Sequence, residues 1–292
     1  HLSPEISVVT NIDNDHLDFY ENNLEKLDAT FLQFLENLPF YGNAIICIDT
    51  QRSKEVFSRL SRPKVSYGFD KKADYFLKDL NQTGEFQEFT IVKNATGKET
   101  RLKLALAGKH NALNATAAFI VSQKAGINIK VIKDSFKNFG GVSRRMEQKG
   151  QIEINKNKIK LIDDYGHHPT EIKATIEAVK ATNPKKKVSM IFQPHRFSRS
   201  TLLFEEFIEC LSALDNVIVL DIYSAGEQNP KNINSYTFVN ALIEKGTNAY
   251  FAKNLDEICS TLDSFISNDQ ILITQGAGNI VDISNSIYAI YK

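Results

Sequence analysis

The chain has 292 residues, of which 42% are hydrophobic and 24% charged, a composition typical of a globular protein with room for two domains. Its 35 basic and 35 acidic residues cancel and its apolar runs are only of strand length, so we expect no nucleic-acid and no membrane partner. Three widely spaced cysteines argue against a disulfide framework or a zinc site and favour a reducing, cytoplasmic location.

The first half of the chain alternates strands and helices and then changes to strands alone. Apolar residues at helical spacing predict a helix over residues 24–38 whose apolar stripe belongs to the core. That stripe consists of Leu24, Leu27, Phe31, Phe34, Leu35 and Leu38. The other expected elements are strands at 6–10, 43–49 and 64–68, a helix at 53–60, an antiparallel hairpin or small sheet over 74–106, and helices at 108–126 and 131–139.

The second half follows the glycines at 140 and 141, which are typical of an interdomain hinge, and alternates strand and helix throughout. The expected strands are 146–154, 158–163, 187–192, 216–221, 248–251 and 270–275, with helices ending near residues 182 and 214, at 235–245 and 255–266, and at the end of the chain. Such alternation requires a mostly parallel sheet with helices on both faces. The sequence therefore predicts an α/β protein with two domains, residues 1–142 and residues 143–292, the second of them Rossmann-like.

Polar loops follow the strands of the second half. Residues 163–171 join two carboxylates, a phenol and two imidazoles, and residues 193–199, 223–227 and 275–279 follow the neighbouring strands. Because ligands bind at the carboxyl edge of open α/β sheets, these loops are the first candidates for a site. The alternative for residues 163–171 is a polar, capped helix start without a ligand.

Several pairs of side chains in these loops and helices suit the recognition of phosphate, carboxylate or purine. Arg196 and Arg199 lie three residues apart at a helix start and can offer forked donors to an anion. Asn111 and Asn114 share a helix face and can read a purine edge, although an Asn there is more often a cap. The arginines at 144 and 145 beside the hinge suit a phosphate clamp or, alternatively, a solvated linker. His16 lies in a polar loop that could ligate a divalent cation or simply be solvated.

The motifs together resemble the Mur ligases. The resemblance is carried in order by residues 10–16, 108–114, 141–145, 163–171 and 192–199. Tyr-Gly-His-His-Pro-Thr-Glu and Pro-His-Arg-Phe are similar to the member of the family that joins L-alanine to UDP-N-acetylmuramate. The family has three domains, and this chain resembles the later part of the central P-loop ATPase domain and the whole Rossmann-like C-terminal domain. Without a Gly-x-x-x-x-Gly-Lys-Ser/Thr motif or a UDP-binding domain, we expect that an N-terminal part is missing and that the fragment alone is inactive.

The resemblance implies ATP-dependent amide formation through an acyl phosphate, with ATP and Mg²⁺ required. It implies that His16 helps to hold a metal ion and that Asn111 and Asn114 contact adenine. It further implies that the catalytic residues are Arg145, Asp164 and His167, of which Arg145 and Asp164 also contact the nucleotide. The residues implied to line the site for L-alanine and the product are Tyr165, His167, Arg196 and Arg199.

Three other functions fit parts of the sequence. A ligase that reattaches recycled murein peptides shares the chemistry, and activity with a tripeptide but not with free L-alanine would favour it. A non-catalytic nucleotide-binding module would follow if the natural protein began near residue 1. A metal-dependent hydrolase built on His167, His168, Asp163 and Asp164 lacks a third ligand at metal spacing.

Overall fold

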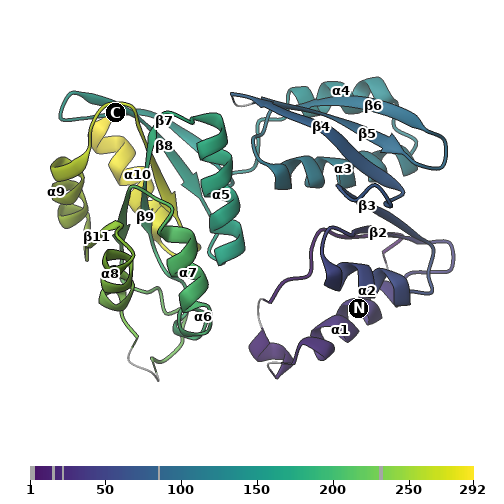
Figure 1. The fold of residues 1–292 in the computed structure, drawn as a ribbon, viewed down its shortest axis with the longest axis horizontal. Coiled ribbons are helices and arrows are strands. Elements are labelled where there is room, and N and C mark those ends of the chain that lie inside the picture. Colours follow the sequence, from purple (N-terminus) through teal and green to yellow (C-terminus); the bar gives the residue numbers. More distant parts are fainter. Residues whose placement is uncertain (1–3, 15–16, 22, 85, 230–232) are drawn as a thin grey trace. The chain divides into compact units, whose positions relative to one another are not determined.

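The computed structural model describes residues 4–14, 17–21, 23–84, 86–229 and 233–292. It divides into two compact units, His1–Gly140 and Gly141–Lys292 (Figure 1). Each unit contains a six-stranded sheet with helices packed on both of its faces. The predicted α/β fold, with sheets that are mostly parallel, is confirmed.

The first sheet has the strand order β1-β2-β3-β4-β5-β6. Its strands are β1 (Ile6–Val9), β2 (Asn43–Cys47), β3 (Lys64–Gly68), β4 (Tyr75–Thr83), β5 (Phe86–Lys93) and β6 (Lys98–Leu104). The first four pair in parallel and the last three form an antiparallel meander. The antiparallel segment expected over 74–106 is therefore present, and it extends the parallel sheet through the short β3–β4 pairing.

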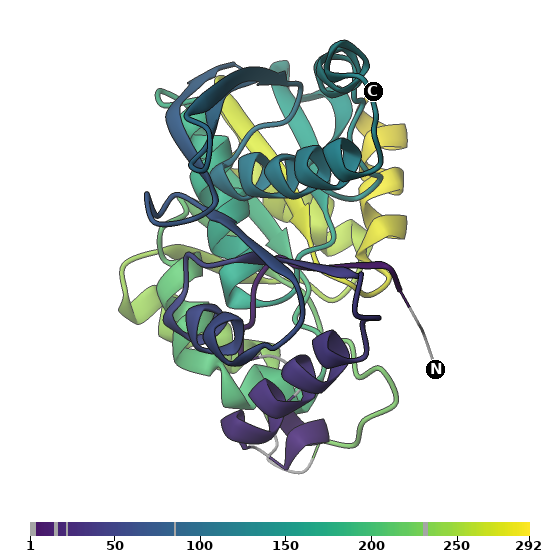
Figure 2. The same cartoon turned by 90° about the vertical axis from the view of Figure 1, so that its right-hand side faces the viewer.

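The helices of the first unit lie on opposite faces of its sheet (Figure 2). The short 3-10 helix η1 (Leu17–Tyr20), α1 (Leu24–Glu36) and α2 (Gln51–Arg59) cover one face, and α3 (Lys109–Lys124) and α4 (Ile129–Lys137) cover the other. The stripe expected on α1 is only partly core. Leu27 and Leu35 are buried, whereas Leu24 and Phe34 are exposed, because the face that contacts the sheet is narrower than the apolar stripe.

The second sheet has the order β11-β10-β9-β12-β8-β7. Its strands are β7 (Glu147–Ile154), β8 (Asn157–Asp164), β9 (Lys187–Phe192), β10 (Asn216–Val219), β11 (Asn248–Phe251) and β12 (Gln270–Gln275). All neighbours pair in parallel except β7 and β8. β9 and β12 are buried almost along their whole lengths, because helices cover both faces of the sheet.

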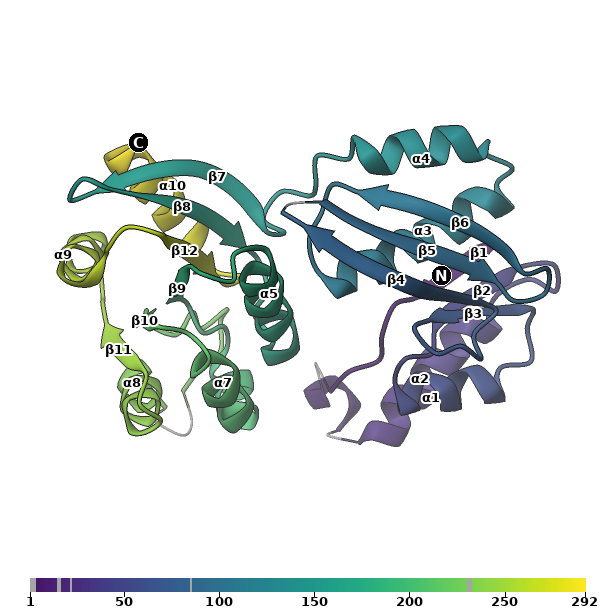
Figure 3. The same cartoon turned by 45° about the horizontal axis from the view of Figure 1, so that its top comes forward.

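Figure 3 shows how the helices of the second unit divide between the two faces. They are α5 (Pro169–Thr182), α6 (Phe197–Leu202), α7 (Phe204–Leu211), α8 (Ser235–Glu244), α9 (Leu255–Phe265) and α10 (Ile280–Tyr291). α5, α7 and α8 pack into one apolar cluster and α9 and α10 into another. The single helix expected to end near residue 214 is two helices, because Leu203, with φ −111° and ψ 27°, leaves the helical region between α6 and α7.

Candidate functional site

The polar loops of the second unit converge at the carboxyl edge of its sheet, as predicted. β8, β12, β9 and β10 are consecutive parallel strands, so their carboxyl ends meet at one edge. Backbone hydrogen bonds join the loops there: the Gly276 N–H donates to the Asp164 carbonyl at 3.0 Å, and the Tyr223 N–H donates to the Pro194 carbonyl at 2.8 Å. The fold therefore fixes side chains from four separate segments beside one another.

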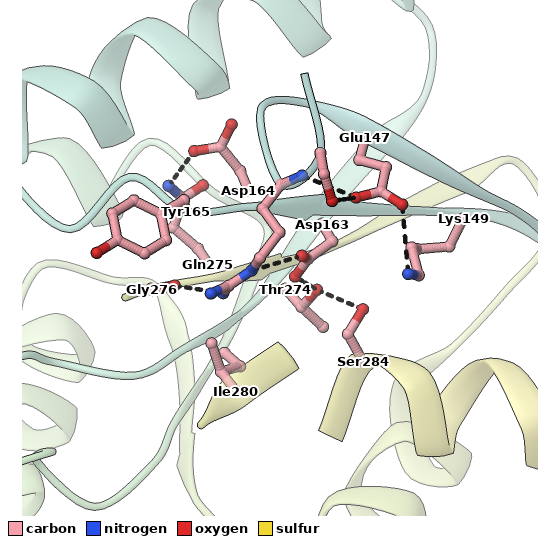
Figure 4. A network of polar contacts seen from close by, with 12 residues as sticks. Glu147, Lys149, Asp163, Asp164, Tyr165, Thr274, Gln275, Gly276, Ile280 and Ser284 are labelled. Carbon is pink, nitrogen blue, oxygen red and sulfur yellow. Dashed lines mark hydrogen bonds and ion pairs between the residues drawn. The ribbon is translucent and has the colours of Figure 1, made fainter. Parts of the chain in front are cut away.

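Asp163 and Asp164 end β8 and point into different surroundings (Figure 4). Asp163 is fully buried and binds the Arg144 guanidinium, whose Nε donates to Oδ2 at 3.0 Å. The two oxygens of Asp164 accept hydrogen bonds from the backbone N–H groups of Met146 and Gly166, each at 2.8 Å. Burial raises the pKa of Asp164 above its usual value, although these hydrogen bonds oppose the shift.

Gln275 and Gly166 complete the surroundings of Asp164. The Gln275 side-chain amide donates to Asp164 Oδ1 at 2.8 Å and to the Gly166 carbonyl at 2.7 Å. A Cβ on Gly166 would lie 2.6 Å from Gln275 Nε2 and 2.7 Å from Asp164 Oδ1, so only glycine fits there. Asp164 thus holds the loop in place by accepting hydrogen bonds from Met146, Gly166 and Gln275.

The two adjacent histidines have different positions. His168 is buried and caps α5: its Nδ1 accepts from the Thr170 N–H at 3.3 Å. Glu171 completes a capping box by accepting from the N–H groups of His167 at 2.9 Å and His168 at 3.2 Å. Burial acts to raise the pKa of Glu171, but the His167 N–H and the Arg145 guanidinium bring it below its usual value. His168 therefore fits the capped helix start that the sequence allowed as an alternative. The His167 ring instead contacts other aromatic rings at the same edge of the sheet.

Four rings form a row along the edge, in the order Tyr165, His167, His195 and Tyr223. Tyr165 and His167 meet edge to face, and the rings of His167 and His195 are tilted, each pair with centroids 5.3 Å apart. His195 and Tyr223 stack at 5.4 Å with an interplanar angle of 12°. The row connects the loops after β8, β9 and β10, so no single stretch of sequence contains it.

His195 is held in its neutral form. Burial lowers its pKa to about 4, and the neighbouring side chains of His167, Arg199 and Arg196 act in the same direction. Nδ1 lies 3.4 Å from Arg199 Nη1. Because a guanidinium only donates, Nδ1 accepts this hydrogen bond and the neutral ring carries its proton on Nε2.

The two arginines predicted to bind an anion have different neighbours. Arg196 caps α6 with φ of +67°, and its Nη1 lies 3.6 Å from Glu227 Oε1. Arg199 is only 7% exposed and reaches His195. Glu227 also accepts from the Ser198 N–H at 3.0 Å, so the loop after β10 fixes the start of α6.

The glycines before α10 are explained by packing. A Cβ on Gly276 would lie 2.8 Å from the Gln193 carbonyl oxygen, and one on Gly278 would lie 2.8 Å from Tyr223 Cγ. The Gln193 side chain bridges to α10, donating to Asn279 Oδ1 at 2.7 Å and accepting from the Ile280 N–H at 3.1 Å. The two glycines of this segment let the loops after β9 and β10 approach α10 closely.

The remaining predicted site residues lie in the first unit or outside the described residues. His16 lies outside the described residues. Asn111 and Asn114 lie in the first two turns of α3, which follows Gly108 with φ of +99°. The Asn111 amide donates to the Ala107 carbonyl at 2.7 Å, and Asn114 is exposed. Neither Asn caps α3, because its N-cap is Gly108, without a side-chain cap hydrogen bond; Asn111 instead contacts the residue before the helix, and the Asn114 side chain is open to solvent.

The sequence selected His195, Tyr223 and Glu227 only as members of the candidate loops 193–199 and 223–227, and it did not predict that Arg144 pairs with Asp163. Position at the ends of parallel strands indicated these loops, but the partners of the side chains lie in other loops. Among the described residues, no group of three or more His, Cys, Asp or Glu side chains could hold a metal ion. The described helices also include none that combines the length and apolar character of a membrane span.

Comparisons with known proteins assign both units. Residues 1–122 match the family described as Mur ligase middle domain, and residues 144–278 match the one described as Mur ligase, glutamate ligase domain. The structure of UDP-N-acetylmuramate-alanine ligase from Thermotoga maritima is 25% identical, with a TM-score of 0.78 over 99% of this chain and 60% of that one.

Two further solved structures share the fold. The murein peptide ligase from Psychrobacter arcticus is 17% identical, with a TM-score of 0.66 over 99% of this chain and 57% of that one. The MurF ligase from Thermotoga maritima, in complex with ADP, is 18% identical, with a TM-score of 0.73 over 98% of this chain and 62% of that one. The chain thus spans about 60% of the length of the first of these relatives.

Proposed function

Because the chain belongs to the Mur ligase family and matches its middle and C-terminal domains, we propose that it is part of an ATP-dependent ligase. In this proposal the ligase joins L-alanine to UDP-N-acetylmuramate in peptidoglycan precursor synthesis. In this proposal, residues 1–142 are the C-terminal part of the ATPase domain and residues 143–292 bind the amino acid. An N-terminal part of the same enzyme supplies the P-loop and the UDP-sugar site, so the fragment alone is inactive. We place the enzyme in the cytoplasm.

The observation that carries the proposal is the row of four rings with Arg199 beside its third ring, His195. Arg199 is 7% exposed, and a guanidinium that is partly removed from water binds a carboxylate more strongly than an exposed one does. The His195 ring contacts this guanidinium, and the rings of His167 and Tyr165 continue the row from there. The guanidinium suits the carboxylate of L-alanine.

The residues that we assign to ATP are Asn111, Asn114, Arg145 and Asp164. Asn114 is exposed on α3, where its amide is available to adenine, and Asn111 is in the first turn of the same helix. Arg145 is 49% exposed and pairs with Glu171, with Nη1 and Oε1 3.0 Å apart. It can therefore exchange this partner for a phosphate, whereas Asp164 supports the loop beneath it. When bound, ATP with Mg²⁺ activates the muramate carboxylate as an acyl phosphate, and His16 would help to hold the metal ion.

The amide-forming step requires an uncharged alanine amine near the acyl group. The neutral His195 ring can accept no proton at Nδ1, where Arg199 donates to it, and its Nε2–H is a donor. We assign it to orienting a substrate oxygen. His167, whose Nδ1 lies 3.2 Å from the Tyr165 carbonyl oxygen, is the candidate to take part in the proton transfer.

The test uses the full-length protein with UDP-N-acetylmuramate, ATP and Mg²⁺. Phosphate release and product mass are measured with L-alanine, glycine and an L-alanyl tripeptide as acceptors. We expect L-alanine to be the preferred acceptor. Use of the tripeptide but not of L-alanine would instead identify a murein peptide recycling ligase. ATP binding without phosphate release for any acceptor would identify a non-catalytic nucleotide-binding module.

A further inference from the structure

The segment that leads into the second unit has a backbone conformation that its side chains disfavour. Arg144 and Met146 have φ of +57° and +52°, in the left-handed region that residues with a Cβ rarely adopt. Such a conformation persists only where neighbouring contacts fix it. Arg145 lies between these two residues, so the contacts that fix them also fix the backbone from which the Arg145 side chain extends.

The Arg144 side chain provides the first of these contacts, and Figure 4 labels its partners Asp163 and Gly276. Its Nε donates to Asp163 Oδ2 at 3.0 Å, and its Nη2 donates to the Gly276 carbonyl oxygen at 2.7 Å. Asp163 is fully buried, and its other oxygen accepts from the Thr274 hydroxyl at 2.7 Å. Arg144 is therefore attached to the ends of both β8 and β12.

Backbone hydrogen bonds provide the other contacts. The Tyr165 N–H donates to the Arg144 carbonyl at 2.6 Å, and the Met146 N–H donates to Asp164 Oδ2 at 2.8 Å. The Arg144 N–H donates to Glu147 Oε2 at 2.7 Å and holds the pKa of that carboxyl below its usual value. The two adjacent aspartates thus bind different parts of this segment: Asp163 binds the Arg144 side chain, and Asp164 binds the Met146 backbone N–H.

The side chains of Arg144 and Arg145 consequently differ in how firmly their contacts hold them. The side chain of Arg144 is 18% exposed and its partner Asp163 is fully buried, whereas Arg145 is 49% exposed and its partner Glu171 is 34% exposed. Both guanidinium groups lie over the Tyr165 ring, 5.1 and 5.3 Å from its centroid. Arg144 is suited to anchoring, and Arg145 to exchanging its partner for a ligand.

We propose that Arg144, through Asp163, is a positioning residue that sets Arg145 and Tyr165 in place for the reaction. We call the contact of Arg144 with Asp163 the anchor. It fixes the Arg144 carbonyl, which accepts from the Tyr165 N–H, and it fixes the backbone on both sides of Arg145. What Arg145 and Tyr165 contact in turn rests on the proposed function, but the anchor itself does not.

Hydrogen exchange of the 292-residue chain tests the anchor directly. Lysine at 144 keeps the charge but lacks the planar fork through which Arg144 donates to Asp163 and to the Gly276 carbonyl at once. In R144K we expect the amides of Met146 and Tyr165 to exchange at least about tenfold faster, with α9 unchanged. The control R101K alters an exposed ion pair with Glu88 in the other unit and should change neither amide. Unchanged exchange in R144K would overturn the proposal.

If R144K does not fold, R144M/D163N gives the same measurement without leaving a buried charge unpaired. Faster exchange at Met146 and Tyr165 in this double variant supports the anchor, and wild-type exchange refutes it.

A kinetic cycle in the full-length ligase tests whether Arg144 acts through Arg145. We expect R144K to lower kcat/KM for ATP about tenfold, and to lower it less than about twofold further when R145A is already present. Losses that multiply would refute action through Arg145. Full activity of R145A alone would instead refute the nucleotide contact in the proposed function, and hydrogen exchange would still decide whether the anchor fixes this segment.

Discussion

Residues of the same type have different surroundings at this site, and burial is what separates them. Arg196 pairs with the carboxylate of Glu227, whereas Arg199 is 7% exposed and reaches a neutral imidazole. The Arg196 side chain is 29% exposed and so is less removed from water than Arg199. We therefore expect a substrate carboxylate to gain more from Arg199 than from Arg196.

The first prediction concerns Arg199. In the full-length ligase, R199A should raise KM for L-alanine about 10- to 100-fold, because a charge-assisted hydrogen bond contributes roughly 1.5–3 kcal/mol. KM for ATP should change less than about twofold. Steady-state kinetics with each substrate varied separately measures both constants. R101A removes an arginine that is 75% exposed and serves as the control. Equal losses for L-alanine and ATP would contradict the assigned role.

The second prediction concerns the neutral His195. Its pKa is about 4 in the folded protein against an ordinary value of 6.5, so the unfolded chain takes up the proton first as the pH falls. The stability that the neutral ring contributes is thus fully present above pH 6.5 and is lost as the pH falls through about 4. Urea unfolding between pH 7 and pH 4 should show H195Q losing about 1–3 kcal/mol less than the wild type. If the free energy of unfolding fell equally with pH in H195Q and in the wild type, the neutral state of His195 would be contradicted.

At the scale of elements, the site depends on how closely the loops after β9, β10 and β12 approach one another. Gly276 and Gly278 allow that approach, because a Cβ at either position would overlap Gln193 or Tyr223. The capping box of His168 and Glu171 places α5 at the same edge. These contacts join elements that are distant in sequence, and each stabilises an arrangement that no single loop could adopt alone.

The third prediction is that G278A destabilises the second unit. Its Cβ would lie 2.8 Å from Tyr223 Cγ and still closer to Gln193 Oε1, so a ring or the loop must move. We expect a loss of about 1–3 kcal/mol in the free energy of unfolding, measured by urea denaturation. G140A, where nothing lies within 4 Å of the added Cβ, should change it by less than about 0.5 kcal/mol. Similar effects of the two variants would exclude the steric explanation.

At the scale of the whole molecule, each unit has its own cores. The apolar clusters around α5, α7 and α8 and around α9 and α10 consist only of residues from 141–292. The clusters of the first sheet consist only of residues from 1–140. A unit that buries two such clusters within itself meets the usual requirement for independent folding.

The fourth prediction is therefore that residues 141–292 expressed alone fold. Circular dichroism should show native-like α/β content and a single cooperative unfolding transition, as expected for a domain of this size. A matched control begins at residue 187 and lacks β7, β8 and α5. It removes a parallel neighbour of β12 from inside the sheet and should not unfold cooperatively. Loss of cooperativity in both pieces would contradict the independence of the second unit.

The sequence by itself determined the class of fold, the order of its elements and the edge at which the site would be found. Alternating apolar runs and helical stripes are local patterns, and the carboxyl ends of neighbouring parallel strands must lie together, so both could be predicted without coordinates. Tyr165, His167 and Arg199 were selected on that basis together with the family resemblance. Those signals depend on residues close to one another in the chain.

Only the tertiary structure decided which of these side chains contact one another. The sequence could not show that Asp163 binds Arg144 while Asp164 binds the Met146 backbone, or that His195 stacks on Tyr223. It also could not show that Leu24 and Phe34 lie outside the core. Burial and hydrogen-bond partners depend on segments that are far apart in the chain, and the strand order and helix packing that bring those segments together are properties of the folded molecule.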